Sequence, residues 1–147
     1  MALIGPADQA RLKEDFSQLT NAVRLLFFTQ TLDCETCVQT RQILDELPPL
    51  SDKISVEEVN FILESDRAKQ FGIDRVPAIA IVGTNESGAE RDSHIRFLGT
   101  PSGYEFISVI RAILLVGGGP SQLSAESREA IAAVTTPKTL HVFTTPT

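Results

Sequence analysis

Cys34 and Cys37 are the only cysteines of this 147-residue chain, and their types and spacing are the features best suited to chemistry. Two thiols this close can form a disulfide, and the thiolate form of a cysteine attacks other disulfides. On the first turn of a helix, free backbone N–H groups would stabilise that thiolate. We therefore predict thiol–disulfide exchange, with Cys34 as the exposed attacking cysteine and Cys37 as the buried resolving one.

Three other interpretations of the cysteine pair are less favoured. A purely structural disulfide across so short a loop would remove little entropy from the unfolded chain. A zinc site would need two more ligands, and His94 and His141 are too far apart in the sequence to form a pair by spacing. A pair of inert core cysteines remains an alternative, although Asp33 and Glu35 make this stretch polar.

The step from Val76 to Pro77, just before a predicted strand, is a second candidate feature. A cis proline here would place its neighbours opposite the cysteine helix. Because proline lacks an N–H group, Val76 would be left free to pair with an extended substrate segment. An ordinary proline at the start of a strand remains the alternative.

Hydrophobic periodicity indicates the elements that must position these residues. A slip in the alternation at Glu57 and Glu58 predicts a bulge or an early end of the second strand, and a polar loop over 83–92 separates the third strand from the fourth. The predicted helices are 7–19, 34–47, 65–71, 102–116 and 125–134, and the predicted strands are 23–29, 54–61, 78–82, 94–98 and 139–143.

The order of the elements predicts an α/β fold with a mixed four-stranded sheet. Strands joined by a helix should be parallel, and the last two strands of the sheet, joined by a loop, should be antiparallel. Helices would then cover both faces. The glycine-rich break at 117–120 predicts a domain over residues 1–117 and a separate remainder over 118–147.

The remainder contains a short internal similarity, because residues 140–146 align with residues 25–31 of the first strand. We interpret it as a linker helix and the first strand of a second repeat, in a chain cut from a tandem-repeat protein. Chance similarity between two apolar strands is the alternative. Since residues 139–143 have no sheet of their own, we expect them to pair with a neighbouring molecule or to be poorly ordered.

Composition narrows the class of protein. Hydrophobic residues make up 42% and charged residues 22%, which suits a packed core, and the net charge of −6 disfavours binding to nucleic acid or anionic membranes. The chain has no apolar run of the ~20 residues that cross a bilayer, and its start does not resemble a signal peptide. With two cysteines only, we expect a cytoplasmic protein without a metal or cofactor.

The motifs together resemble the thioredoxin fold. The stretch from Phe97 to Phe106 (FLGTPSGYEF) is more narrowly similar to the first repeat of tandem, glutaredoxin-like protein disulfide oxidoreductases, and to the N-terminal domain of the alkyl hydroperoxide reductase flavoprotein subunit. The resemblance covers about residues 7–147. It implies a nucleophile at Cys34, a resolving residue at Cys37, a cis proline at Pro77 and a substrate-pairing residue at Val76.

Departures from better-known thioredoxins concern charge. Asp33 replaces the tryptophan before the motif, and Phe28 occupies the position of a buried acid. The helix end would favour a thiolate by ~0.3–1 kcal/mol, while Asp33 and Glu35 oppose it and Arg75 offsets them. We predict that the pKa of Cys34 lies near that of a free thiol, which goes with a reducing couple.

The resemblance also implies partners. Protein disulfides or dithiols would be substrates, and a thiol reductant or a flavin-dependent reductase would supply electrons. An alternative function is an inactive docking repeat that supports an active second repeat, because the first repeat of the flavoprotein-type domain lacks the cysteine pair. The retained cysteines favour the enzyme, and the apolar strand near the C-terminus suggests a dimer.

Overall fold

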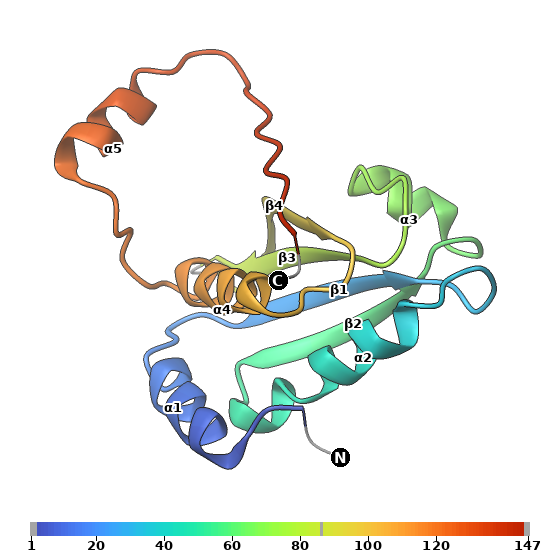
Figure 1. Ribbon diagram of the computed structural model, residues 1–147. Helices are drawn as coiled ribbons and strands as arrows, with labels where there is room; N and C mark the ends of the chain where they lie inside the picture. The colour runs from blue at the N-terminus through green and yellow to red at the C-terminus, as the bar shows by residue number, and fades with distance from the viewer. Residues whose placement is uncertain (1–2, 86, 146–147) are drawn as a thin grey trace.

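A computed structural model describes residues 3–85 and 87–145, and Met1, Ala2, Glu86, Pro146 and Thr147 lie outside the described residues. The α/β class predicted from the sequence is confirmed (Figure 1). The elements are α1 (Pro6–Phe16), β1 (Val23–Thr29), α2 (Cys37–Asp45), the 3-10 turn η1 (Pro48–Leu50), β2 (Ile54–Asn60), α3 (Ser65–Gln70), β3 (Ala78–Thr84), β4 (Glu90–Leu98), α4 (Tyr104–Val116) and α5 (Ala125–Ala132).

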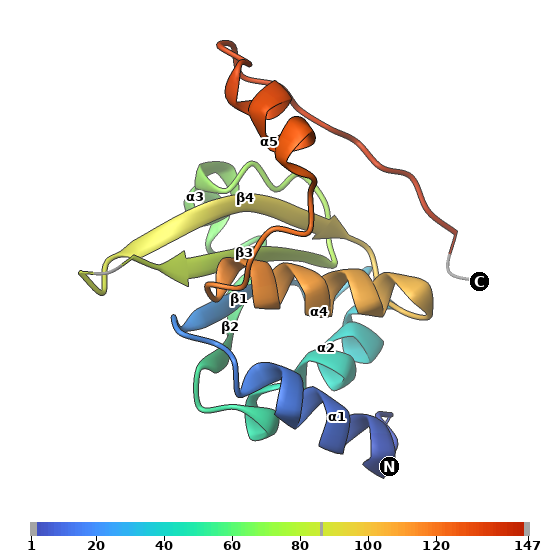
Figure 2. The same ribbon diagram turned by 90° about the vertical axis from the view of Figure 1, so that its left-hand side faces the viewer.

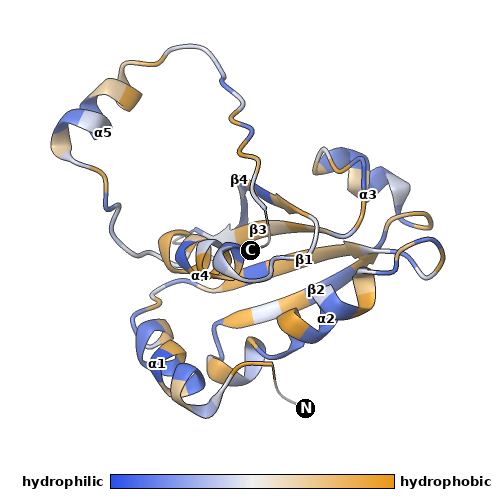
Figure 3. Cartoon of the chain, in the orientation of Figure 1, coloured by the Kyte–Doolittle hydropathy of each residue, from blue (hydrophilic) through white to orange (hydrophobic). Residues whose placement is uncertain are grey.

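Four strands form a mixed sheet in the order β2-β1-β3-β4. Strand β1 pairs with β2 in parallel and with β3 antiparallel, and β3 pairs with β4 antiparallel, as predicted. The central strands β1 and β3 are the more apolar ones, as Figure 3 shows in orange. A strand buried on both faces needs such a continuous apolar sequence.

Each face of the sheet has its own apolar core. One core gathers Leu25 and Phe27 of β1 with residues from α1, α2 and α4. The other gathers Leu26 and Phe28 of β1 with Ala68 of α3. Helices therefore lie on both faces, as Figure 2 shows, but the short α3 is the helix that contributes to the second core.

The hairpin of β3 and β4 is longer than the sequence indicated. The predicted loop over 83–92 is mostly strand, because β3 reaches Thr84 and β4 begins at Glu90. The pairing register shifts between Ala80 and Val82, and His94 opposite this shift has φ of +61°. An irregularity of this kind breaks the alternation of side chains, which hid the first half of β4.

Strand β2 contains no bulge, contrary to the prediction. It pairs with β1 in one register over all seven residues. Glu57, where the apolar alternation slips, instead forms ion pairs with Arg24 of β1 and Arg67 of α3. These partners let an acidic residue occupy a regular edge strand.

The remainder after α4 differs from the prediction in one element. Helix α5 forms, capped by Ser124, whose hydroxyl accepts a hydrogen bond from the Ser127 N–H. Residues 139–143 form no strand, because no neighbouring strand offers them hydrogen bonds. Their apolar side chains point to solvent, and Phe143 is 92% exposed. Burial against the same domain, which would have contradicted the predicted association, is therefore not seen.

No helix among residues 3–85 and 87–145 has the length and apolar character needed to cross a membrane.

Candidate active site

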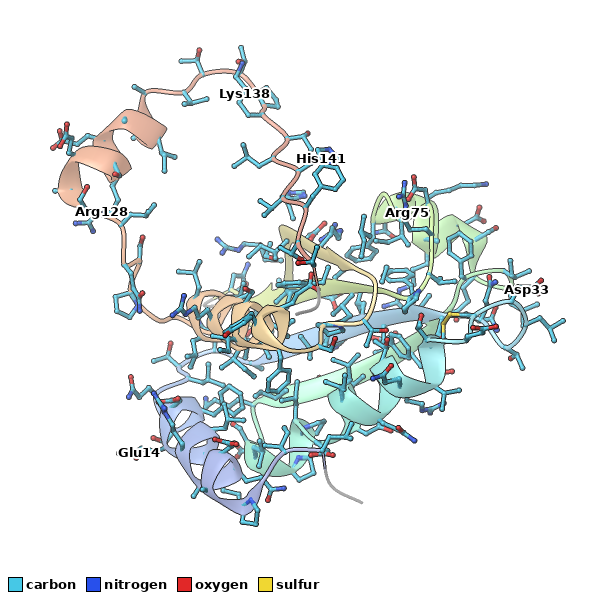
Figure 4. All side chains as sticks on the ribbon, in the orientation of Figure 1. Glu14, Asp33, Arg75, Arg128, Lys138 and His141 are labelled. Carbon is cyan, nitrogen blue, oxygen red and sulfur yellow. A yellow bond between two sulfur atoms is a disulfide. The ribbon has the colours of Figure 1, made fainter. Side chains whose placement is uncertain are left out.

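Cys34 and Cys37 form a disulfide, with their Cα atoms 5.4 Å apart. The pair lies where the chain leaves the C-terminal end of β1 and enters α2, and Figure 4 shows its yellow sulfur–sulfur bond beside Asp33. Cys34 is partly exposed, whereas Cys37 is buried in the larger core. One sulfur is thus accessible and the other is shielded.

The predicted place of Cys34 on the first helical turn is wrong. Helix α2 begins at Cys37, and Cys34 belongs to the turn before it, in which the Cys37 N–H donates to the Cys34 carbonyl at 3.3 Å. Asp33, just before this turn, has φ of +55°, so the chain bends there and cannot extend the helix backwards.

The peptide bond between Val76 and Pro77 is cis, as the resemblance implied. Pairing of Phe28 with Ala78 places this bond at the end of the sheet from which the chain leads to Cys34. Pro77 is buried, while Val76 is half-buried and packs against the larger core, as Cys34 does. The fold therefore gathers both sequence motifs at one end of the sheet.

Arg75, expected to offset the acidic neighbours of Cys34, binds another partner. Its guanidinium donates two hydrogen bonds to Asp74, at 2.8 and 3.0 Å. The hydrogen bonds from Arg75 are the largest cause that lowers the pKa of the Asp74 carboxyl. Asp33 and Glu35 are exposed beside the disulfide. The charge of Arg75 is thus largely compensated locally.

Phe28 occupies the buried position as predicted. It is fully buried, and its ring centroid lies 6.0 Å from that of Phe71 on the α3 side of the sheet. An apolar ring there supplies no proton acceptor for the cysteine pair.

The sequence analysis missed two threonines at the site. The hydroxyl oxygens of Thr40 in α2 and Thr100 before α4 lie 2.8 Å apart. Thr40 was detectable in principle, because it falls on the apolar stripe of the helix between Cys37 and Leu44. Thr100 could not be paired with it from sequence, since 60 positions separate them.

Exposed apolar side chains near the disulfide were also missed, and we call them the apolar rim. They lie in the segments that follow β1 and β2 and on the first turn of α2. These two strands are parallel, so the segments that follow them leave the same end of the sheet. The rim consists of Leu32, Val38, Ile62 and Leu63, which are 77%, 65%, 63% and 83% exposed.

The sheet order, the cis proline and the disulfide at the start of α2 define a thiol–disulfide oxidoreductase of thioredoxin fold. No family model matches the sequence. A probable thioredoxin from Methanothermobacter thermautotrophicus is 32% identical over 78 residues, which cover 52% of this chain and 80% of that protein. The chain therefore belongs to the thioredoxin family.

Similarity extends to larger reductases. The F-type alkyl hydroperoxide reductase protein of Xanthomonas campestris pv. phaseoli is 37% identical over 89 residues, covering 60% of this chain and only 14% of that protein. The solved NTD_N/C domain of alkylhydroperoxide reductase AhpF from Enterococcus faecalis aligns with a TM-score of 0.78 and 27% identity, covering 89% of this chain and 61% of that one.

A protein disulfide oxidoreductase from Aeropyrum pernix shares the fold, with a TM-score of 0.72 at 20% identity over 88% of this chain and 55% of that one. The chain thus spans a small part of the alkyl hydroperoxide reductase from Xanthomonas and most of the small thioredoxin.

Proposed function

We propose that this chain exchanges disulfides with protein substrates, with Cys34 as the nucleophile and Cys37 as the resolving cysteine. The observation that carries the proposal is the unequal exposure of two bonded sulfurs, because Cys34 is accessible and Cys37 is 4% exposed. A protein substrate can reach the first sulfur only, so the second is left for the intramolecular step.

The exchange balances as two displacements. The Cys34 thiolate attacks a substrate disulfide, which forms a mixed disulfide and releases one substrate thiolate. The Cys37 thiolate then attacks the Cys34 sulfur, which restores the internal disulfide and releases the second substrate thiolate. Two electrons pass to the substrate, and every step runs in reverse when a dithiol is oxidised.

The surroundings of the disulfide support a protein as the substrate. The apolar rim presents large side chains to solvent around the site, as surfaces that bind other proteins do. Within the described part of the chain, the backbone of Val76 makes no hydrogen bond. An extended substrate segment could therefore pair with Val76 beside Pro77.

A thiol reductant or a flavin-dependent reductase would return electrons to the disulfide, in keeping with the similarity to alkyl hydroperoxide reductases. We place the reaction in the cytoplasm, where reductants keep such pairs in turnover.

Reduction of insulin disulfides by dithiothreitol tests this function. We expect the wild-type chain to accelerate insulin precipitation and the Cys34→Ser chain to return it to the rate without protein, because serine cannot form the mixed disulfide. Glu126→Gln, on the exposed α5, serves as a control that keeps full activity. Equal background rates for wild type and Cys34→Ser would reject the enzyme and leave the docking repeat.

The division of roles has its own test. With Cys37→Ser, we expect a stable mixed disulfide between Cys34 and a substrate thiol, visible by mass spectrometry as a dithiothreitol-sensitive adduct. With Cys34→Ser, the buried Cys37 should give at least ~10-fold less adduct, because it is 4% exposed. Equal adduct in the two variants would contradict the assignment.

A further inference from the structure

Two threonine hydroxyls link the cysteine turn to a distant loop. Thr40, which is fully buried in α2, donates a hydrogen bond to the carbonyl of Thr36 at 2.9 Å. Its oxygen lies 2.8 Å from the hydroxyl of Thr100, in the loop between β4 and α4. Thr100 also donates to the same Thr36 carbonyl, at 3.4 Å.

The carbonyl that these hydroxyls bind belongs to the turn between the two sulfurs. Thr36 lies between Cys34 and Cys37, and its carbonyl also accepts the backbone N–H of Thr40 at 3.0 Å. Three donors thus converge on one oxygen, whereas an ordinary helical carbonyl accepts a single backbone bond. This excess of donors is what an ordinary helix start would not require.

The same loop also holds the proline side of the site. The N–H of Gly99, the residue before Thr100, donates to the carbonyl of Pro77 at 2.8 Å. Two neighbouring residues of the loop therefore bond to the cysteine turn on one side and to the cis proline on the other.

We propose that Thr40 and Thr100 are positioning residues for the Cys34–Cys37 couple, which hold the Thr36 carbonyl in the arrangement of the oxidised turn. The inference deepens the proposed exchange function and rests on it only for its biological use. Breaking the sulfur–sulfur bond lets the sulfurs separate, so the turn must adjust. Hydrogen bonds that fit the oxidised turn favour that form and disfavour the dithiol.

The equilibrium with glutathione measures this preference. Two glutathione thiols give two electrons and two protons to the Cys34–Cys37 disulfide, which yields the dithiol and one glutathione disulfide. In the full chain, we expect Thr40→Val to shift the equilibrium constant toward the dithiol by about threefold, which is ~14 mV at 29.6 mV per tenfold change. Alkylated thiols quantified by mass spectrometry give the ratio.

Companion variants separate positioning from stability. Thr100→Val should give a similar shift, and the double variant should shift less than the sum of the two, because the hydroxyls act together. Thr40→Ser keeps a hydroxyl and should keep the wild-type constant. Thr84→Val is the matched control, since its hydroxyl bonds to the Ala22 carbonyl far from the cysteines.

Unchanged glutathione equilibria in Thr100→Val and in Thr40→Val would overturn the inference, even if melting temperatures fall, because a merely structural role lowers the stability of both redox forms alike. If Thr40→Val does not fold, the partly exposed Thr100 decides the outcome alone. An equal shift in Thr84→Val would also overturn it. Since glutathione replaces the protein substrate, failure of the insulin assay would reject the proposed function without touching this result.

Discussion

Cys34 has a mixed electrostatic environment. It precedes α2 instead of lying on its first turn, so the helix end acts on it from a distance. Asp33 and Glu35 flank it with exposed carboxylates, and Arg75 is bound to Asp74. None of these features strongly favours a thiolate over a thiol.

We therefore expect the pKa of the Cys34 thiol in the reduced chain to stay close to the value of a free thiol. Thiolate absorbance followed against pH measures it, and the Cys34→Ser chain supplies the contribution of Cys37. Asp33→Asn should lower the pKa modestly, because it removes a negative charge beside the thiolate. A midpoint in the acidic range of strongly oxidising thiols would contradict this electrostatic account.

At the scale of single residues, sequence spacing predicted the chemistry but not its supports. The pair at 34 and 37 was legible because both cysteines sit in one short segment. The cis bond at Pro77 needed the resemblance to a family, since either isomer suits the start of a strand. The contact of Thr40 with Thr100 depends on the folded loop, which no local pattern encodes.

Among the elements, the edge strand β2 is tied to its neighbours by one carboxylate. Glu57 accepts hydrogen bonds from Arg67 of α3 and, at 3.1 Å, from Arg24 of β1. The hydrogen bond from Arg67 is the largest cause that lowers the pKa of Glu57 below its ordinary 4.5. A carboxyl whose pKa is lowered by folding stabilises the fold at a pH above its unfolded value.

This stabilisation is lost as pH falls through the lowered pKa. We expect Glu57→Gln to reduce the free energy of unfolding at pH 7 by up to about 1 kcal/mol, since the pair is half-exposed. The difference from wild type should shrink below about pH 4, where Glu57 of the wild type is itself protonated. Urea midpoints between pH 3 and 7 measure it, with Glu126→Gln as control. A difference that persists at pH 3 would contradict the assignment.

Element prediction succeeded where period and environment agreed. Strand β1 has the predicted bounds, because both of its faces are buried and its sequence is continuously apolar. Strand β4 was half missed, because the bulge near His94 changes which face each side chain takes. Its Asp92 and Arg96 bind each other at 2.6 Å and so occupy strand positions that look like loop residues.

On the scale of the whole molecule, we propose that residues 1–117 form the thioredoxin-like domain and that 118–147 begin a second unit. Figures 1 and 2 show α5 and the segment after it standing away from the sheet. Helix α5 has no buried residue. The Gly119 N–H still bonds to the carbonyl of Leu114, so the domain closes about there.

A chain ending at Gly119 should therefore unfold with a free energy within about 1 kcal/mol of the full chain, because little apolar area is lost with the rest. Sedimentation at increasing concentration should show association of the full chain only, through the exposed Leu140, Val142 and Phe143. Polar substitution of Phe143 should weaken that association. Loss of folding in the shortened chain would reject the boundary.

The central place of β1 has a consequence for synthesis. Strand β1 emerges from the ribosome early, but its second neighbour β3 ends at Thr84, 55 residues after Thr29. At ~5–20 residues per second, the strand's apolar face and unpaired edge wait roughly 3–11 s for that partner. Nascent chains of this length offer a seven-residue apolar segment to chaperones, and to one another on crowded polysomes.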